Sequence, residues 1–228
     1  MIIQLHQRDF FLSIFKAFTD KKQVDITISS DNLLIKVIEI DRIYFNLDKS
    51  NFSSNFDFKI SLDPSNLYKA LNLLNTNLIE IENDHVLLKN FNNSFESFVK
   101  IPLLSTKDHC YEEITEIHTR FMIHPKNIES ICFLKGLVRY EIENDTLFIR
   151  KMAREVFNEI EIRDVDFIDV GELSFSCNNN WVSMIESISK EIKGIIFNFS
   201  DCFLSVQFLF ENNENVFLEI QIPKSLIK

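Results

Sequence analysis

The chain has 228 residues, 46% of them hydrophobic, and a formal net charge of −10. This length accommodates one large domain or two domains of about a hundred residues each. The hydrophobic content is typical of a globular protein and excludes an intrinsically disordered chain. Such an acidic net charge normally argues against DNA as a partner.

Targeting and disulfide signals are both missing from the sequence. The N-terminal MIIQLHQRDFF lacks the basic region and apolar core of a signal peptide, and no segment reaches the ~18 apolar residues that a membrane helix needs. The four cysteines, Cys110, Cys132, Cys177 and Cys202, are far apart and have no CxxC spacing. This pattern favours a reducing compartment and no membrane association.

The first predicted elements are a strand, a helix and three further strands. Residues 1–7 predict the strand, and the segment 8–20 carries Phe10, Phe11, Ile14, Phe15 and Phe18 at helical spacing. The alternating segment ITISSDNLLIKV, from Ile26, predicts a β-hairpin with Asp31 in its turn, and residues 41–48 predict a third strand.

The same order of elements follows a second time. Residues 56–63 predict a strand, and the helix over 63–75 begins with Asp63 as N-cap and Pro64 at its first position. The segment IEIENDHVLLKN, from Ile79, predicts a hairpin with Asp84 in its turn, and a strand over 93–104 follows.

Two more units of this kind complete the chain. The third has a strand over 119–125, a helix over 124–136 ended by Gly136, a hairpin at Asp145 and a strand over 154–164. The fourth has a strand over 171–178, a helix over 178–194 ended by Gly194, a hairpin at Asp201 and a strand over 214–223.

The spacing of the four hairpins indicates internal symmetry. Their aspartates are 53, 61 and 56 residues apart, and each helix begins 20 to 23 residues before its aspartate. A βαβββ unit repeated four times, and paired into two similar halves, explains this period. We expect domains at 1–103 and 119–228, joined by an interdomain connector loop over 104–118, where the periodicity is lost.

This pattern resembles the DNA sliding-clamp family, to which PCNA and the heterotrimeric Rad–Hus DNA-damage checkpoint clamp belong. DPSNLYKALNLL followed by LIEIENDHVLLKN is similar to the second helix and hairpin of the family, and FLSVQFLFENNENVFLEIQIPK to its closing strands. The resemblance implies an α+β fold of two similar PCNA-like domains, each of two βαβββ units. Helices then line one face, and antiparallel sheets form the outside.

The resemblance also implies a function without catalysis or cofactor. A trimeric ring would encircle duplex DNA independently of sequence, placed there by a clamp loader, and recruit polymerase, nuclease, ligase or checkpoint factors through peptide motifs. The closing strands resemble a checkpoint-clamp subunit, which implies two different partner chains and a nuclear location. The alternatives are a PCNA-type homotrimeric processivity factor for DNA polymerase and a duplicated β-rich interaction module unrelated to DNA.

The charge distribution is compatible with a DNA-facing helical surface. The four helical segments (8–22, 63–74, 125–135 and 178–193) together carry nine Lys or Arg and six Asp or Glu, although the whole chain is acidic. Phosphate contacts need only a local basic surface. The predicted DNA-facing residues are Lys16, Lys69, Lys126, Lys135 and Lys190, although lysines are common on any solvated helix.

The resemblance places two further sites on the chain. A partner-peptide groove would be formed by Ile38, Ile40, Ile43, Phe45, Pro102, Leu103, Leu104, Ile220, Ile222 and Pro223; the alternative is that these are core residues. Subunit interfaces would be formed by two edge strands, with Phe95, Phe98 and Lys100 on one and Val156, Asn158, Glu159 and Glu161 on the other.

Catalytic and metal sites find little support in the sequence. His109, Cys110, Glu112, Glu113 and His118 gather in the connector, but without the spacing of a metal site. The acidic run Asp164, Asp166, Asp169 and Glu172 lacks the glycine of a calcium-binding loop and predicts a solvated turn. We expect no metal.

Overall fold

The structure is a computed structural model that describes residues 1–92, 95–106, 113–151, 158–211 and 216–225, apart from the side chains of 91, 92, 95 and 189. The chain divides into two compact units. The first contains residues 1–38 and 44–110, and the second contains 39–43 and 111–228. The boundary at 110/111 lies within the predicted connector, 104–118.

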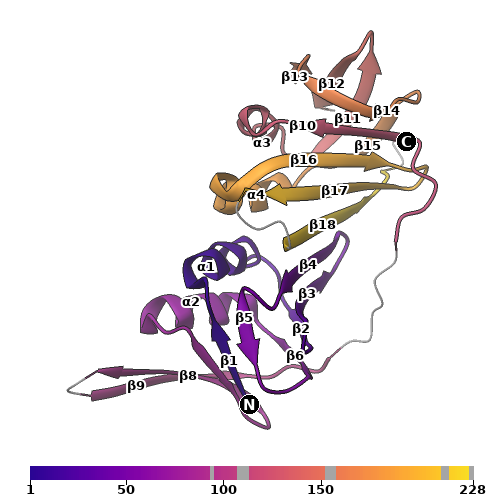
Figure 1. The fold of residues 1–228 in the computed structure, drawn as a ribbon. Helices are drawn as coiled ribbons and strands as arrows, with labels where there is room; N and C mark the ends of the chain where they lie inside the picture. Colours follow the sequence, from indigo (N-terminus) through magenta and orange to yellow (C-terminus); the bar gives the residue numbers. More distant parts are fainter. Residues whose placement is uncertain (93–94, 107–112, 152–157, 212–215, 226–228) are drawn as a thin grey trace. The chain divides into compact units, whose positions relative to one another are not determined.

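The first unit has two antiparallel sheets and two helices (Figure 1). One sheet has the strand order β5-β1-β7-β8-β9, and the other strands are neighbours in the order β4-β3-β2-β6. The bounds are β1 (Ile2–Leu5), α1 (Arg8–Ala17), β2 (Val24–Ile28), β3 (Asn32–Ile38), β4 (Arg42–Asp48), β5 (Phe52–Ser54), β6 (Phe58–Leu62), α2 (Pro64–Leu74), β7 (Leu78–Ile81), β8 (His85–Asn92) and β9 (Phe95–Pro102).

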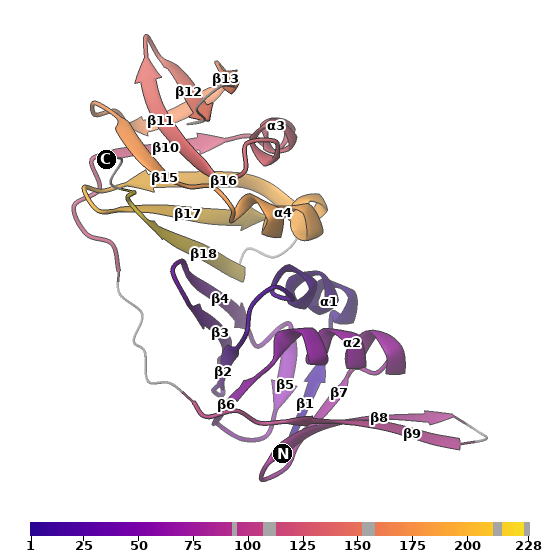
Figure 2. The same cartoon turned by 180° about the vertical axis from the view of Figure 1, so that it is seen from behind.

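The second unit repeats this arrangement (Figure 2). Its strands are neighbours in the orders β14-β10-β16-β17-β18 and β13-β12-β11-β15. The bounds are β10 (Thr119–Ile123), the 3₁₀ helix η1 (Pro125–Asn127), α3 (Ile128–Cys132), β11 (Leu137–Glu143), β12 (Thr146–Lys151), β13 (Asn158–Ile162), β14 (Val165–Asp169), β15 (Ser174–Asn178), α4 (Val182–Ile188), the 3₁₀ helix η2 (Ser189–Glu191), β16 (Ile192–Phe199), β17 (Phe203–Phe210) and β18 (Val216–Pro223).

The predicted α+β fold with four βαβββ units is confirmed. Each lead-in strand, helix and group of three strands occurs in the expected order. All four aspartates lie in hairpin turns. Asp31, Asp84 and Asp145 take the third position of a four-residue turn, whereas Asp201 takes the second, between Ser200 and Phe203.

Asparagine and aspartate shape the turns of this chain, which has three glycines. Asn144 and Asp145 have φ angles of 49° and 57°. A two-residue type I′ hairpin turn requires positive φ at both positions, and Asn and Asp tolerate it better than other residues with side chains. At Gly136 φ is 95°, which favours glycine, and this residue ends the segment between α3 and β11.

The helices are amphipathic and bury one face against the sheets. Leu67, Leu71 and Leu74 of α2 are buried, and the Asp63 carboxylate accepts hydrogen bonds from the backbone N–H groups of Ser65 and Asn66. The predicted N-cap is therefore confirmed, and it satisfies donors that a helix start leaves free. In the first unit α1 packs against α2 (Figures 1 and 2), and in the second α3 packs against α4.

The third and fourth helices are shorter than predicted. The third ends at Cys132, which leaves Lys135 in the segment before β11. The fourth becomes a 3₁₀ helix at Ser189, and Ile192 begins β16 instead of belonging to the helix. Gly194 is therefore no helix cap. It lies at an irregularity of β16, where an added Cβ would come within 3.2 Å of the Met122 sulfur.

Two strands, β5 and β14, were not predicted. Each is the outer strand of its sheet, next to β1 and β10 respectively, so the duplication extends to them as well. The prediction of a solvated turn at Asp164–Glu172 is wrong for Asp166 and Asp169, which lie in β14. The half-buried Phe167 of this strand packs edge-to-face on Phe121, with ring centroids 5.9 Å apart.

Candidate nucleic-acid interface

Lys16 on α1 and Lys69 on α2 point their side chains into solvent from the helical layer of the first unit. Both are exposed, and neither forms an ion pair with any residue that the structure describes. Residues close to them in the sequence but on the other side of each helix, such as Phe15 and Leu71, are buried. The amphipathic spacing that fixes the core therefore also fixes these two ammonium groups on the outer side of the helices.

Arg8 was counted with the basic helical residues, but the structure gives it another role. Its guanidinium donates to the carbonyl oxygens of Leu71, at 2.9 Å, and Thr76, at 3.2 Å. The last carbonyls of a helix have no partner within the helix, so Arg8 satisfies the end of α2 and joins it to α1. Its side chain is 19% exposed.

Two of the three predicted lysines in the second unit form ion pairs. Lys126 pairs with Asp164, and the Lys135 ammonium lies 2.9 Å from Glu186. The hydrogen bond from Lys126 holds the pKa of the Asp164 carboxyl below its ordinary value. Lys190, exposed in η2, forms no ion pair among the described residues. Three of the five predicted DNA-facing lysines thus keep their charge uncompensated.

Most of the predicted peptide-groove residues lie in the core or close to it. Ile43, Phe45, Ile220 and Ile222 are at most 2% exposed, which agrees with the core alternative for these four. Ile38, Leu103 and Pro223 are half-buried and Pro102 is exposed. Ile40 and Leu104 expose 82% and 40% of their surface.

The start of the connector is fixed to the first unit. The Leu104 N–H donates to the Ser61 carbonyl at 2.8 Å, and the Leu103 N–H donates to Asp84 at 2.9 Å. Gln23 donates to the Ser105 carbonyl at 2.9 Å. These bonds make 103–105 part of the sheet surface.

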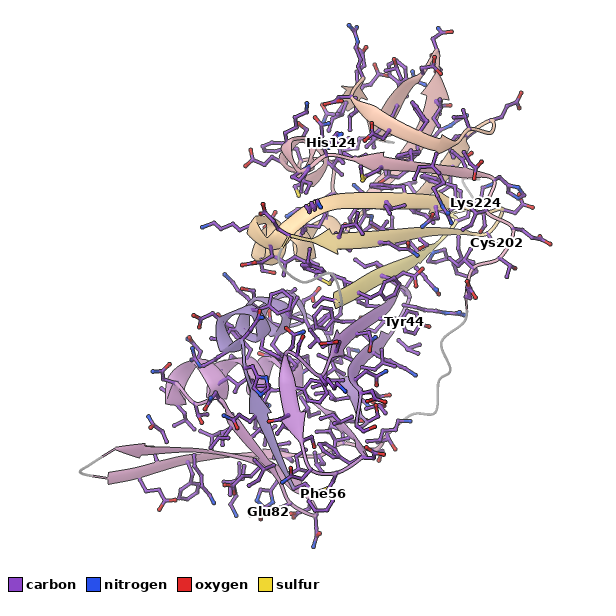
Figure 3. All side chains as sticks on the ribbon, in the orientation of Figure 1. Tyr44, Phe56, Glu82, His124, Cys202 and Lys224 are labelled. Carbon is purple, nitrogen blue, oxygen red and sulfur yellow. The ribbon has the colours of Figure 1, made fainter. Side chains whose placement is uncertain are left out.

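The end of the connector forms a hollow that was not predicted from the sequence. It has a volume of about 220 Å³ and lies within the second unit. Three acidic residues, Glu113, Glu116 and Asp201, line it together with Arg42 and Cys202. Cys202 is exposed (labelled in Figure 3). The alternation of apolar residues does not predict this hollow, because its polar residues come together only where residues 113–116 approach the turn between β16 and β17.

The two predicted interface strands are both at sheet edges. Among the described strands, β9 pairs only with β8 and β13 pairs only with β12. Phe98 is 60% exposed, and Lys100, Asn158, Glu159 and Glu161 are exposed as well. The side chain of Phe95, and the whole of Val156, lie outside the described residues.

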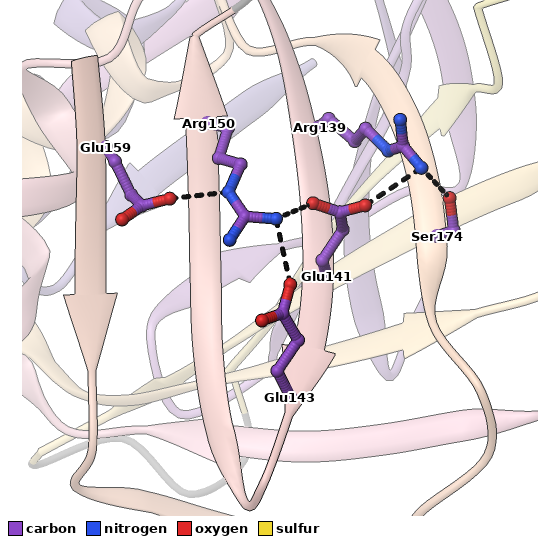
Figure 4. A network of polar contacts seen from close by, with 6 residues as sticks. All are labelled: Arg139, Glu141, Glu143, Arg150, Glu159 and Ser174. Carbon is purple, nitrogen blue, oxygen red and sulfur yellow. Dashed lines mark hydrogen bonds and ion pairs between the residues drawn. The ribbon is translucent and has the colours of Figure 1, made fainter. Parts of the chain in front are cut away.

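A network of charges crosses the β13-β12-β11-β15 sheet of the second unit (Figure 4). Arg150 contacts Glu141, Glu143 and Glu159, and Arg139 joins Glu141 to Ser174. These carboxylates raise the pKa of Arg150 further above its ordinary value, with Glu159 contributing most. The network links β13, an edge strand, to β12, β11 and β15.

The described residues contain no cluster of three or more His, Cys, Asp or Glu side chains that could hold a metal ion. His109, Cys110 and Glu112 of the connector lie outside the described residues. His118 faces Asp201 at 3.4 Å, and His124 faces Asp166 at 3.1 Å. Of the helices that the structure describes, none has the length and apolar character that crossing a membrane requires.

Sequence comparison finds no protein-family model and no curated protein that match this chain. Among solved structures, the chain is similar to one from the PCNA2–PCNA3 complex of Sulfolobus tokodaii, with a TM-score of 0.79. The match covers 98% of this chain and 99% of the other, at 13% sequence identity. The fold is that of PCNA. Helices α1 to α4 are thus the helical layer of a PCNA fold, and β9 and β13 are edge strands of its sheets.

Proposed function

We propose that this chain is a sliding-clamp subunit that does no chemistry and encircles duplex DNA in a three-subunit ring. The observation that supports this proposal best is the PCNA fold along 98% of the chain, with 99% of the neighbouring structure covered. That neighbour is part of a complex of two different PCNA chains, which supports a ring made with further subunits. A ring holds DNA by enclosing it, so neither a catalytic group nor a cofactor is needed.

DNA contact is assigned to the helical layer. Lys16, Lys69 and Lys190 carry uncompensated charge there, while Lys126 and Lys135 are paired with carboxylates. A few weak phosphate contacts allow sliding without sequence preference. A strongly basic surface would slow sliding along DNA. The acidic net charge of the chain is therefore compatible with a clamp that slides.

The role of the ring depends on its composition. With two different partner chains it would be a checkpoint clamp that recruits damage-response and repair factors in the nucleus, as the closing strands suggest by resemblance. With two further copies it would be a processivity factor for a DNA polymerase. In both, a clamp loader opens the ring, and peptide motifs dock at exposed groove residues such as Ile40 and Leu104.

A trapping experiment tests the topological mechanism without a loader. The chain, alone or with the subunits that copurify with it, is incubated with linear duplex DNA that carries biotin at both ends. Streptavidin then blocks the ends, and a high-salt wash removes proteins held by charge alone. We expect retention on blocked DNA and loss from unblocked DNA. Equal loss from both would reject the clamp function.

A further inference from the structure

Strand β14 forms a longer sheet edge than its counterpart in the first unit. It spans five residues, Val165–Asp169, and pairs only with β10 among the described strands. Its counterpart β5 spans three residues, Phe52–Ser54, and the Ser54 hydroxyl donates to the Phe56 carbonyl at 3.0 Å in a turn directly after the strand. Natural proteins keep exposed edges short, because their N–H and C=O groups attract further strands. The β5 edge has this protection, whereas the β14 edge stays open for longer.

The chain stays close to β10 beyond the end of β14. The Gly171 N–H donates to the Thr119 hydroxyl at 3.3 Å. A Cβ at Gly171 would come within 2.8 Å of the His118 carbonyl oxygen, so this close approach of two backbones requires glycine. Residues 165–171 therefore form one continuous edge beside β10.

Two large apolar side chains are exposed along this edge. Ile168 exposes 55% of its surface and Val170 exposes 59%, whereas Phe167 packs on Phe121. The register with β10 shifts between Arg120 and Phe121, so Ile168 is the additional residue of a β-bulge and has no partner on β10. Exposed apolar residues at an open edge provide contacts for the side chains of an added strand.

Two carboxylates beside these apolar residues have no compensating charge. Asp169 and Glu172 are exposed, and neither forms an ion pair among the described residues. Arg120 is the partner of Asp169 in the register with β10, but its Nε–H donates to the side-chain oxygen of Asn198 at 2.6 Å. The edge therefore combines exposed apolar residues with uncompensated negative charge.

This charge decides which kind of partner fits the edge. Asp166 adds a third exposed carboxylate, which faces the imidazole of His124 at 3.1 Å. Pairing of two β14 edges from two copies of the chain would bring Asp166 and Asp169 of both copies together, and like charges across strands are destabilising. The phosphates of a nucleic acid would meet the same carboxylates. A strand that carries lysine or arginine compensates them instead.

From the open edge, its apolar residues and its charge we infer that β14 binds an extended basic segment of a partner protein as an additional strand. Main-chain hydrogen bonds to β14 provide affinity. Ile168 and Val170 contact apolar side chains of the segment, and its lysines or arginines pair with Asp166, Asp169 and Glu172. The inference goes beyond the proposed function, because this docking site needs neither DNA nor further subunits.

Binding of defined peptides to the full chain tests this site. The probe is a short fluorescein-labelled peptide of alternating lysine and valine, and fluorescence anisotropy at low salt measures its dissociation constant. One control peptide of the same length has glutamate in place of lysine. The other keeps every side chain but is N-methylated at each residue, so its backbone donates no hydrogen bonds. We expect both control peptides to bind about tenfold more weakly or less.

Hydrogen exchange and two paired variants locate the site. With the lysine–valine peptide bound, backbone amides within 165–171 should exchange more slowly, and those of β5 should not change. Asp169→Asn with Glu172→Gln should weaken binding about fivefold, since exposed ion pairs contribute modestly. Asp57→Asn with Glu211→Gln is the matched control. It removes the same charge at two exposed carboxylates that have no ion pair among the described residues, so binding should stay that of the unchanged chain.

A further variant, Ile168→Ser with Val170→Ser, keeps every charge and alters exposed residues only, so folding is retained; binding should weaken about tenfold.

Several results would overturn the inference. Absence of binding by the lysine–valine peptide rejects it. Equal binding of the N-methylated peptide, or equal weakening by both charge variants, would show attraction by net charge alone. Slower exchange only outside 165–171 would place the peptide elsewhere. The DNA-trapping experiment uses no peptide, so failure of this site and failure of the proposed function are distinguished.

Discussion

Lys16 and Lys69 differ from Lys126 and Lys135 in what their ammonium groups already contact. The first two lie in solvent without an ion pair among the described residues, and the other two face Asp164 and Glu186. A lysine already paired with a carboxylate contributes less to the affinity for a phosphate. The carboxylate must either be released first or stay close to the negatively charged DNA. The helical layers of the two units therefore differ in their expected affinity for DNA.

We predict that Lys16→Glu with Lys69→Glu lowers the affinity for linear duplex DNA and reduces its salt dependence. Each phosphate contact contributes about 0.9 to the slope of log affinity against log salt, so the slope should fall by about two or more. Fluorescence anisotropy over a salt series measures this. Lys49→Glu, outside the helical layer, gives a control with one charge reversed. An unchanged slope in the double variant would show that these lysines do not meet phosphate.

At the same scale, the contact between Lys126 and Asp164 predicts a pH dependence of stability. Its hydrogen bond lowers the pKa of Asp164 in the folded protein from the ordinary 3.8. A lowered pKa stabilises the fold at pH values above the unfolded pKa, and this contribution is lost as the pH falls through the folded pKa. Lys126→Met should therefore destabilise the protein at neutral pH and have no such effect at pH values well below 3.8.

Urea unfolding at both pH values measures the stability difference, and carboxyl NMR titration reports the pKa of Asp164 directly. Lys193→Met, at an exposed lysine without an ion pair among the described residues, should give the same small effect at both pH values. A pKa of Asp164 that Lys126→Met leaves unchanged would contradict the assignment.

At the scale of elements, the charge network holds an edge strand in place. Arg150 joins β12 to β13 through Glu159 and to β11 through Glu141 and Glu143. Without its guanidinium, Glu143 and Glu159 would lose their only ion pair among the described residues, and Glu141 would keep only its contact with Arg139. Like charges that face each other across strands destabilise a sheet.

We therefore predict that Arg150→Met lowers the thermal unfolding midpoint more than Arg163→Met does. Arg163 contacts Glu161 alone among the described residues and is 80% exposed, so it serves as the control for loss of an arginine. Differential scanning calorimetry compares the two variants. The midpoint of the Arg150 variant should recover partly at low pH, where the carboxylates are protonated. Equal midpoints at neutral pH would assign no special role to the network.

The elements also show how far sequence patterns predict this fold. Hairpins and helices α1 and α2 follow from alternation, helical spacing and the Asp63 cap, all of which are local signals. The end of α4 was misjudged because Ile192 fits both a helical stripe and a strand, and its pairing with Phe210 of β17 decides for the strand. β14 was missed because its exposed polar residues mask the alternation, and only the contact of Phe167 with Phe121 shows its buried side.

The candidate site could be predicted only in part. Exposed lysines follow from the amphipathic pattern, but their pairing with Asp164 or Glu186 depends on elements distant in sequence. Phe133 and Leu73 were not singled out, because a large apolar residue in a helical pattern predicts the core. Their exposure of 82% and 75% is a property of the folded units alone.

At the scale of the whole molecule, the duplication matches strand for strand. The order β5-β1-β7-β8-β9 in the first unit corresponds to β14-β10-β16-β17-β18 in the second, and β4-β3-β2-β6 corresponds to β13-β12-β11-β15. Similar units nevertheless present unlike surfaces, since Leu73, Phe98 and Lys100 belong to one unit and Phe133 and Glu159 to the other.

A cross-linking series tests closure of the proposed ring for the case in which two further copies of this chain complete it. An amine-reactive cross-linker applied to the full chain at rising protein concentration should give covalent dimers and trimers and then no larger species. Phe56→Asp should give the same ladder. Leu73→Asp, on the helix that packs against the predicted interface strand β9, should give monomers. A ladder that continues beyond three with concentration would show that the contact between copies forms without closing the ring.

A cross-linking ladder that continues beyond three copies would correspond to an open, fibre-forming assembly. Two different binding surfaces on one molecule give a closed ring of three copies only if each copy is rotated by a third of a turn relative to the previous one. A rotation that does not close gives an open helical assembly. A substitution far from both surfaces that changed this angle would leave every contact intact and convert a finite assembly into a fibre. Selection on a protein that assembles in this way therefore acts on the rotation between successive copies as strictly as on the contacts themselves.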